Sequence, residues 1–314
     1  MKTIVINKND CDQRLDKFLF KTFKNIPKNL VYKSIRRKNI KLDGKACKPF
    51  TKLLLGQTLD IYLKDEFLFC RNKFNFLDSC DRIDIVFEDK NIILVNKESG
   101  VLCHPDKNTT NNSLIDKISS YLYKKKEYDF LKENSFSPAL VNRLDRNTSG
   151  LVMAAKNAQT LRVLCEKIKN KEVKKFYICV VEGYLNCEKG RLVGFILKNE
   201  NKNKSEILQK SSENSKFALL KYKVLDRKYN KTLVEVELET GRSHQIRAQF
   251  SNIKHPICLD YKYGAKKSAK CQYGFALCSY KIKFLFKNPS CVDYLNFKEF
   301  KVESESFVQK FFKN

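Results

Sequence analysis

The chain has 314 residues, 42% of them hydrophobic, and carries 62 Lys and Arg against 35 Asp and Glu. Its length and apolar content exclude a disordered tail and predict one large and one small domain, or two comparable domains. The formal net charge of +27 favours a nucleic acid as partner, because basic side chains release the counterions condensed on it; the codon usage of an AT-rich genome is an alternative origin of the lysines.

Two helical patterns come first along the chain. Residues 12–26 place four apolar side chains on one helical face and three lysines on the opposite one. Pro27 suits the start of a second helix, because its fixed φ is already helical. That helix is expected to end in the basic run Arg36, Arg37 and Lys38.

Strand patterns follow the two helices. Residues 40–42 and 53–63 are typical of short strands, and Asp43-Gly44 is a typical hairpin turn. We expect three parts in the chain: a small module over residues 1–64, a connector without periodicity over 65–81, and a large domain over 82–314.

The large domain mixes strands and helices without strict alternation, which favours an α+β fold over a doubly wound sheet. Strands are expected over residues 83–87, 92–96, 151–155, 176–182, 217–225 and 233–238, and helices over residues 113–123, 158–168 and 243–252. Residues 198–215 are nearly all Lys, Asn, Ser and Glu, so we expect them to form an exposed loop insertion.

Twelve cysteines are scattered along the chain without a C-x-x-C pair, and none is spaced with the three histidines as in a zinc site. Residues 1–7 are followed by charge rather than by the apolar core of a signal peptide. No run approaches the roughly 18 apolar residues that span a bilayer. We therefore expect reduced thiols, a cytoplasmic location, and neither a metal nor a membrane segment.

The densest polar cluster is residues 142–150, which lie between two apolar runs. Asp145 has Arg143 and Arg146 as close neighbours, and their positive charge should keep its carboxylate ionised. Such a carboxylate, in a turn between buried strands, suits nucleophilic catalysis better than general-acid work. The alternative is an Asx-type turn with solvated arginines.

A second basic cluster spans residues 242–247, where Ser243 can cap a helix. Arg242, His244 and Arg247 would then lie near a helix N-terminus, which is a suitable site for phosphate because its backbone N–H groups are unpaired. Equally, Arg247 could be the buried partner of a carboxylate.

Four residues have both a functional and an ordinary structural interpretation. His104, His244 and His255 fall in turns marked by glycine or proline, where a side chain can serve binding or simply face solvent. Tyr177 lies at the start of an apolar strand, where it could be a core residue.

Four segments resemble, in order, the signatures of the RluA-type family of pseudouridine synthases. They are residues 96–105, 142–156, 175–183 and 238–264. Four such signatures over nearly the whole chain are very hard to obtain by chance. Residues 12–64 resemble the small αL, S4-like RNA-binding module of the large-subunit members, and residues 31–38 resemble the RluC branch most closely.

The chain departs from the family pattern at three places. Asn142 replaces a histidine, Glu98-Ser99 replaces Pro-Ala, and residues 276–278 replace Leu-His-Ala. Because Arg143 and Asp145 are retained, we expect Asn142 to change the support of the site and not its chemistry.

The resemblance implies a mixed, mostly antiparallel sheet and the isomerisation of uridine to pseudouridine in RNA, with no cofactor or metal. It implies that Asp145 is the nucleophile or charge stabiliser in glycosidic cleavage and that Arg247 is its ion-pair partner. Tyr177 would stack on the flipped base or take its proton, and Arg143 would occupy the space that the extruded base leaves in the helix.

Further RNA contacts are expected from Arg146, Arg242 and His244 near the site, and from Arg36, Arg37 and Lys38 on the small module. By resemblance, the module favours large-subunit rRNA over tRNA, and we expect a monomer. Two alternatives remain. One is a non-catalytic RNA-binding or ribosome-assembly protein of the same fold, which Asn142 favours. The other is a nuclease or hydrolase using Asp145 with His104 or His244, which predicts metal dependence or strand scission.

Overall fold

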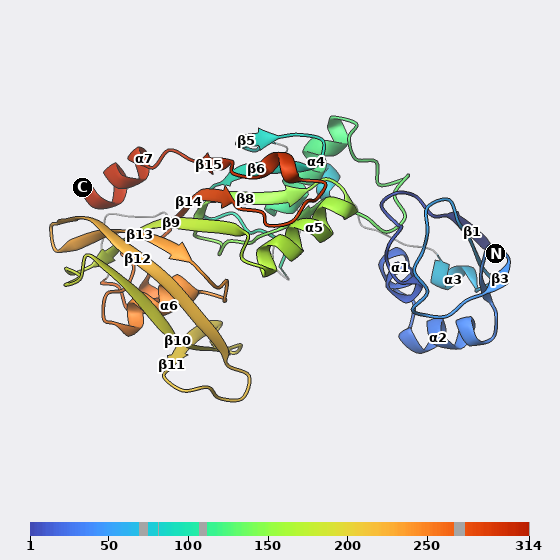
Figure 1. Cartoon of the computed structure of the whole chain (residues 1–314), viewed down its shortest axis with the longest axis horizontal. Helices are drawn as coiled ribbons and strands as arrows, with labels where there is room; N and C mark the ends of the chain where they lie inside the picture. Colours follow the sequence, from blue (N-terminus) through green and yellow to red (C-terminus); the bar gives the residue numbers. More distant parts are fainter. Residues whose placement is uncertain (69–74, 81, 107–111, 267–273, 314) are drawn as a thin grey trace.

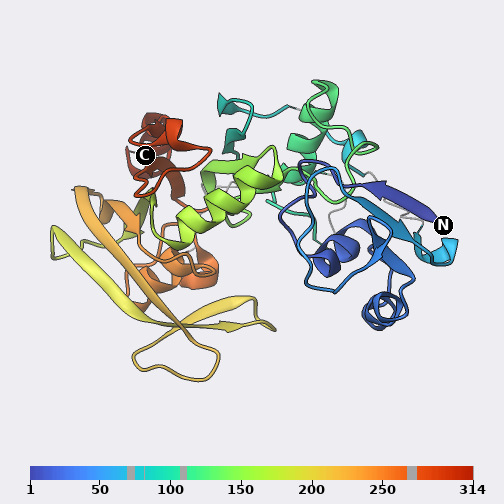
Figure 2. The same cartoon turned by 45° about the vertical axis from the view of Figure 1, so that its right-hand side comes forward.

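The computed structural model describes residues 1–68, 75–80, 82–106, 112–266 and 274–313. It contains a four-stranded sheet and an eleven-stranded sheet. Figures 1 and 2 show the N-terminal module, residues 1–68, beside one end of the large sheet. No helix in the described part of the chain combines the length and the apolar character that a bilayer crossing requires.

The N-terminal module packs two helices on a small sheet of strand order β1-β4-β2-β3. Its elements are β1 (Lys2–Val5), α1 (Leu15–Thr22), α2 (Lys28–Arg36), β2 (Ile40–Leu42), β3 (Lys45–Ala46), β4 (Thr58–Ile61) and α3 (Asp65–Leu68). Phe18 and Val31, one from each of the first two helices, are fully buried in a core of the module's own. Asp43 and Gly44 both have positive φ, which a two-residue hairpin turn between β2 and β3 requires.

The large sheet has the strand order β11-β10-β12-β13-β9-β14-β8-β6-β5, with β15 paired to β14 and β7 paired to β8. Its strands are β5 (Ile85–Glu88), β6 (Ile92–Lys97), β7 (Ala139–Leu140), β8 (Ser149–Ala155), β9 (Val173–Glu182), β10 (Lys189–Asn199), β11 (Lys204–Leu208), β12 (Lys216–Lys228), β13 (Lys231–Leu238), β14 (Leu277–Phe284) and β15 (Glu299–Lys301). Strands β14 and β8 are parallel, whereas the other pairs are antiparallel. The expected α+β fold with a mixed, mostly antiparallel sheet is confirmed.

Helices cover both faces of this sheet. They are α4 (Leu114–Lys124), α5 (Ala158–Lys169), α6 (Gln245–Asn252) and the short α7 (Glu305–Val308). Along β8, Val152 and Ala154 join the core that contains residues of α4 and α6, while Leu151 and Met153 join the core around Leu164 of α5. Because successive strand residues point to opposite faces, β8 is buried on both sides and forms a firm base for the polar turn that precedes it.

Strand β8 begins with a close backbone approach. Gly150 has φ of 107°, and a Cβ added there would lie 2.2 Å from the carbonyl oxygen of Ser279 on β14. The parallel pairing of β14 with β8 occurs at this point, where Ser279 pairs with Gly150. Glycine is therefore required here both for the backbone conformation and for the contact between the two strands.

The expectation of a loop over residues 198–215 is wrong for residues 198–199 and 204–208, which lie in strands. Strand β10 continues to Asn199, and β11 returns along it with Ser205 paired to Lys198. The pairing is between backbone groups, which no side chain indicates. The lysines and asparagines of this segment are typical of a loop, so nothing in the sequence indicates the strand. Ser205 is only 2% exposed, and its hydroxyl donates a hydrogen bond to the Ser243 carbonyl oxygen at 2.8 Å.

The predicted connector carries short helices in its described parts. Leu68 of α3 packs into the core of the N-terminal module. Phe76, in the 3₁₀ helix Asn75–Asp78, packs edge-on against Phe130 of the large domain. Residues 69–74 and 81 lie outside the described part, so the limits of the connector stay a prediction.

A polar contact joins the N-terminal module to the large domain. The carboxylate of Asp10 is fully buried and accepts hydrogen bonds from Asn134 Nδ2 at 2.7 Å and Ser135 Oγ at 2.6 Å. Asn9 Oδ1 accepts a hydrogen bond from the backbone N–H of Ala158 at 3.0 Å, at the start of α5. Since a buried carboxylate that loses its donors is costly, these bonds hold the module against the large domain.

Candidate active site

A cavity of about 1020 Å³ opens beside the turn before β8. This volume is at the upper end of that of ordinary ligand sites. Its described lining includes residues 140–146 of the turn, residues of β9, and residues 238–247 around the start of α6. Asp145, Tyr177 and Arg247 all line this cavity, although they come from three separate parts of the chain.

The turn that carries Asp145 is fixed at its start by Asn142. This side chain is 9% exposed; its Nδ2 donates to the Leu151 carbonyl oxygen at 3.2 Å, and its Oδ1 accepts from the Met153 N–H at 2.8 Å. The amide therefore fastens the turn to β8 with one donor and one acceptor. Both partners are backbone atoms, which agrees with the expectation that position 142 supports the site.

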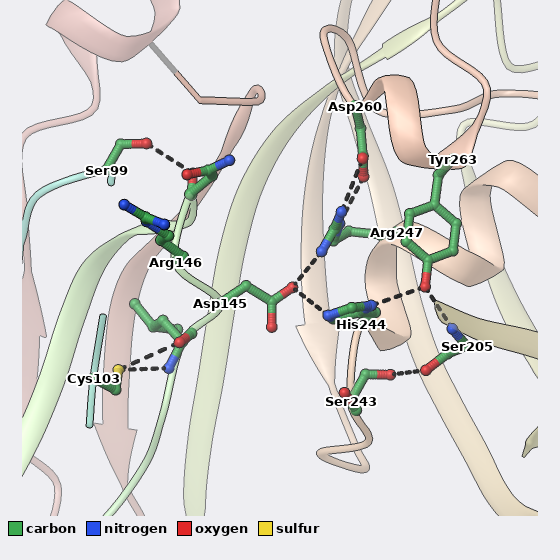
Figure 3. Close-up of polar contacts among 12 residues, drawn as sticks. Ser99, Cys103, Asp145, Arg146, Ser205, Ser243, His244, Arg247, Asp260 and Tyr263 are labelled. Carbon is green, nitrogen blue, oxygen red and sulfur yellow. Dashed lines mark hydrogen bonds and ion pairs between the residues drawn. The ribbon is translucent and has the colours of Figure 1, made fainter. Parts of the chain in front are cut away.

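Residues 97–103 support the same turn from the other side. The Cys103 thiol donates to the Leu144 carbonyl oxygen at 3.3 Å and accepts from the Leu144 N–H at 3.2 Å (Figure 3). Lys97 is 1% exposed, and its ammonium donates to three backbone carbonyls, among them that of Arg146 at 2.9 Å. Residues on both sides of Asp145 are thus anchored, so the position of its carboxylate is well defined.

Arg247 lies between two carboxylates. Its Nη1 donates to Asp145 Oδ2 at 2.9 Å, while its Nε and Nη2 donate to the two oxygens of Asp260 at 2.6 and 2.9 Å (Figure 3). The bidentate pair with Asp260 fixes the plane of the guanidinium, and the third bond aims it at Asp145. The ion pair between positions 145 and 247 that the resemblance implied is present.

Two rings enclose the same guanidinium. Its central carbon is 4.8 Å from the centroid of the Tyr263 ring and 4.3 Å from that of the Phe275 ring. Burial disfavours the charge of Arg247, but the carboxylates of Asp260 and Asp145 outweigh it and raise the pKa of the guanidinium. Arg247 is therefore a permanent buried cation with a single orientation.

His244 is the second group near Asp145. Its Nε2 is 3.9 Å from Asp145 Oδ2, and its Nδ1 is 3.0 Å from the Tyr263 hydroxyl, which accepts the Ser205 N–H at 2.8 Å (Figure 3). Burial lowers the pKa of His244 against the opposing effect of the Asp145 charge, so the imidazole is neutral at pH 7. His244, with φ of 52°, is the residue that precedes α6, so the expectation that Ser243 caps this helix is wrong.

Tyr177 lies on β9 and is 6% exposed. Burial raises the pKa of its phenol, which is consequently protonated at neutral pH. The ring forms part of the cavity wall and of the core at once. Tyr177 is therefore a core residue that also lines the cavity.

The other predicted contact residues fall into two groups. Arg143, Arg146 and Arg242 line the cavity as exposed side chains, as does His104. Of these, Arg146 Nε donates to the Gly100 carbonyl oxygen at 3.0 Å, and Arg242 Nε donates to that of Phe217 at 2.9 Å. The second group, Arg36, Arg37 and Lys38, lies exposed at the end of α2 and is not part of the cavity lining.

Similarity to known proteins identifies the family. The family model for RNA pseudouridylate synthase matches residues 91–252, which contain the whole turn around Asp145 and the start of α6. The chain belongs to this family.

Relatives of this pseudouridine synthase match over most of its length. It is 37% identical to a Mycoplasma capricolum subsp. capricolum protein named "Uncharacterized RNA pseudouridine synthase", over 95% of this chain and 96% of that one. It is 33% identical to ribosomal large subunit pseudouridine synthase C of Buchnera aphidicola subsp. Schizaphis graminum, over 85% and 82% of the two chains. The solved structure of human RNA pseudouridylate synthase domain containing 4 shares the fold, with a TM-score of 0.56, 20% identity, and coverage of 72% and 90%.

Family membership decides the type of reaction. The protein is a pseudouridine synthase that acts on RNA. It is an isomerase rather than a nuclease, a hydrolase or a non-catalytic RNA-binding protein. Within the described residues, no three His, Cys, Asp or Glu side chains come together as a metal site.

Several residues of the site of this synthase were not predicted. Asp260 was not predicted. A lone acidic residue in the apolar segment after Pro256 nevertheless indicates a buried carboxylate that pairs with a cation. Phe275 and Tyr263 enclose Arg247 through contacts that no sequence period indicates. Ser205 lies on a strand within the segment for which the sequence predicts a loop.

Proposed function

We propose that Asp145 is the carboxylate that acts on the ribose of the target uridine. The observation that carries this proposal is the ion pair with Arg247, which restrains Oδ2 of a half-buried carboxylate on the cavity wall. Among the described residues, no donor bonds to Oδ1, so this oxygen can approach C1′ of a nucleotide in the cavity. A carboxylate held in this way is suited both to attack on C1′ and to stabilisation of positive charge there.

The proposed reaction breaks the bond from C1′ to N1 of uracil and forms a bond from C1′ to C5. The hydrogen on C5 is lost and N1 gains one, so the net change is an isomerisation. Arg247 keeps Asp145 oriented during both steps, since its own position is fixed by Asp260. The protonated phenol of Tyr177 supports a role in contact with the base rather than in taking the proton from C5.

The uridine must leave the RNA helix to enter such a cavity, at a cost of a few kcal/mol. We propose that Arg143, which is exposed at the cavity, enters the space that the base vacates. Arg146, Arg242 and His244 would contact the neighbouring nucleotides. The overall charge of +27 supports these contacts, because it attracts the phosphate backbone.

Large-subunit rRNA is the proposed substrate. Support comes from relatives named ribosomal large subunit pseudouridine synthase C and D. It also comes from the N-terminal module, in which the end of α2 is basic and exposed. We propose that this module is of the S4 type and binds rRNA through Arg36, Arg37 and Lys38. We further propose that the protein acts as a monomer in the cytoplasm.

One experiment tests both the residue and the substrate. Pseudouridines are mapped across total RNA from cells that lack the protein and are supplied with the wild type, Asp145→Asn or Asp145→Ala. We expect sites in large-subunit rRNA that return with the wild type alone, while each variant still binds rRNA. Return of the sites with either variant would contradict the role of Asp145, and sites confined to tRNA would contradict the substrate.

A further inference from the structure

Lys175 lies on the face of β9 that carries Tyr177. The two residues are separated by two positions in a regular part of the strand, where Phe176 pairs with Glu237 and Tyr177 pairs with Val236. Because side chains alternate along a strand, Lys175 and Tyr177 share one face. Both residues line the cavity.

The Lys175 ammonium lies close to Gly241, which also lines the cavity. A Cβ added to Gly241 would lie 3.6 Å from Nζ of Lys175 and would meet no other side chain or backbone atom within 4 Å. Gly241 does not have positive φ, so its conformation does not demand glycine. The absence of a side chain at position 241 leaves this side of the ammonium open.

The neighbouring lysine is in the opposite situation. Lys174 also lines the cavity, but its side chain leaves the opposite face of β9, and its Nζ is 3.1 Å from Glu237 and 3.4 Å from Glu239. Lys221 also pairs with Glu239, at 2.6 Å. The nearby carboxylates are thus occupied by other lysines.

In contrast, the ammonium of Lys175 has no hydrogen-bond or ion-pair partner among the residues that the structure describes. It is half-buried, and burial lowers the pKa of its ammonium without a carboxylate to oppose the effect. An unpaired cation in such a place costs free energy, which an anion from outside the chain would recover.

The surroundings also favour an anion. The described lining of the cavity contains eight Lys and Arg and two carboxylates, Asp145 and Glu239. Both carboxylates are already paired, the first with Arg247 and the second with Lys174 and Lys221. A negatively charged group that enters the cavity therefore meets an excess of positive charge.

We propose that Lys175 binds a backbone phosphate of the substrate RNA next to the nucleotide whose base enters the cavity. Because Lys175 and Tyr177 share one face, β9 would contact both the base and the phosphate backbone of the RNA. The inference rests on the proposal that this cavity receives the target nucleotide, but not on the chemical role of Asp145. It can therefore be tested by binding alone.

The test measures the binding of a fluorescein-labelled ten-nucleotide oligouridylate by anisotropy at several salt concentrations. The proteins are full-length wild type, Lys175→Met, Lys175→Arg and the control Lys174→Met, which removes the same charge from the adjacent residue. We expect Lys175→Met to weaken binding about tenfold and to reduce the slope of log K against log salt by about 0.7, the value for one contact to a single strand. Lys175→Arg should retain the slope, and Lys174→Met should change it less than Lys175→Met.

Two outcomes would overturn the proposal. An unchanged salt slope in Lys175→Met would mean that Lys175 meets no phosphate, and an equal loss in Lys174→Met would mean that net charge alone is responsible. Thermal unfolding supplies an independent measurement, since removal of an unpaired cation should leave the Tm of Lys175→Met equal to or above that of the wild type. A lower Tm would show that Lys175 has a structural partner and would also contradict the proposal. Because binding needs no turnover, the same comparison can be repeated with Asp145→Asn in every protein. The same loss of slope there would support the contact of Lys175 whether or not Asp145 acts on the ribose.

Discussion

Two basic regions of this synthase differ in how their charges are held. Arg247 in the cavity is enclosed by two rings and bonded to two carboxylates, so its guanidinium has one position. Arg36, Arg37 and Lys38 at the end of α2 are exposed on the N-terminal module. In the first region the surrounding groups fix the geometry of one charge, while in the second the charges are free to adapt to a partner.

The difference indicates that the two regions serve different purposes: the first positions a reacting carboxylate, and the second attracts the phosphates of RNA. A buried and fully bonded arginine can hold a reacting carboxylate within a fraction of an ångström, which catalysis requires. Exposed cations contribute mainly a salt-dependent attraction to phosphates, which needs no single geometry. Changes in the two regions should therefore affect different measurements.

Among replacements in these two regions, that of Arg247 should have the largest effect on the reaction. Arg247→Lys keeps a positive charge but cannot bond to Asp260 and Asp145 at once, because an ammonium lacks the planar fork of a guanidinium. We expect the single-turnover rate of pseudouridine formation to fall by roughly 10²-fold. RNA affinity should stay close to that of the wild type. A rate within a factor of three of the wild type would show that the orientation of Asp145 does not depend on Arg247.

Replacement of Asp260 tests the same arrangement one step further from the substrate. Asp260→Asn retains the shape of the side chain but loses the charge, so Arg247 keeps a neighbour that holds it less firmly. We expect a fall of about tenfold in the single-turnover rate, typical of residues that orient a functional group. Asp260→Ala should instead lower the free energy of unfolding by about 3–5 kcal/mol, because it removes one partner of a buried ion pair. Equal rates for Asp260→Asn and the wild type would mean that the negative charge of Asp260 is not needed to orient Arg247.

Replacement of the exposed cations should change binding and not chemistry. In the triple variant with Arg36, Arg37 and Lys38 changed to Ala, we expect affinity for rRNA to fall roughly tenfold and the salt slope to decrease by about 2. At saturating enzyme, the single-turnover rate should equal that of the wild type. The same three-charge reduction made at Lys124, Lys125 and Lys126 on the large domain serves as the control for net charge. If the salt slope stays unchanged in the α2 variant, the module does not touch phosphates.

Replacement of Tyr177 should have the smallest effect. Tyr177→Phe keeps the ring that faces the cavity and removes only a hydroxyl whose proton is held at neutral pH. We expect the rate to change by far less than the roughly 10²-fold loss that follows removal of a general base. Tyr177→Leu, which removes the aromatic face, should reduce the rate further. A drop of 10²-fold or more in Tyr177→Phe would assign proton transfer to the phenol after all.

Much of the fold could be predicted from the sequence because its elements carry their own local signals. Helices α1 and α5 follow an apolar stripe, and the hairpin after β2 has a turn that only a few residue types favour. Strand β11 had no such signal, since it has only five residues, begins with Lys, Ser and Glu, and has Ser205 as its one buried residue. Contacts made by backbone groups are not visible in side-chain patterns.

The site was predictable only where a family signature marks it. The resemblance indicated Asp145 and Arg247 as partners across 102 positions of the chain, and the two side chains lie 2.9 Å apart. It did not indicate that Asp260 orients Arg247 or that Asn142 fastens the turn to β8. Those functions depend on three-dimensional neighbours, which the order of residues does not specify.

Helix α5 extends from the N-terminal module to the cavity. Its first residue, Ala158, donates to Asn9 of the N-terminal module, and its last residue, Lys169, lines the cavity. Twelve residues at 1.5 Å each make this helix roughly 18 Å long. An RNA held by the module would therefore meet the cavity at a fixed separation, so the enzyme would select a uridine by its distance from a second binding element as well as by its neighbours.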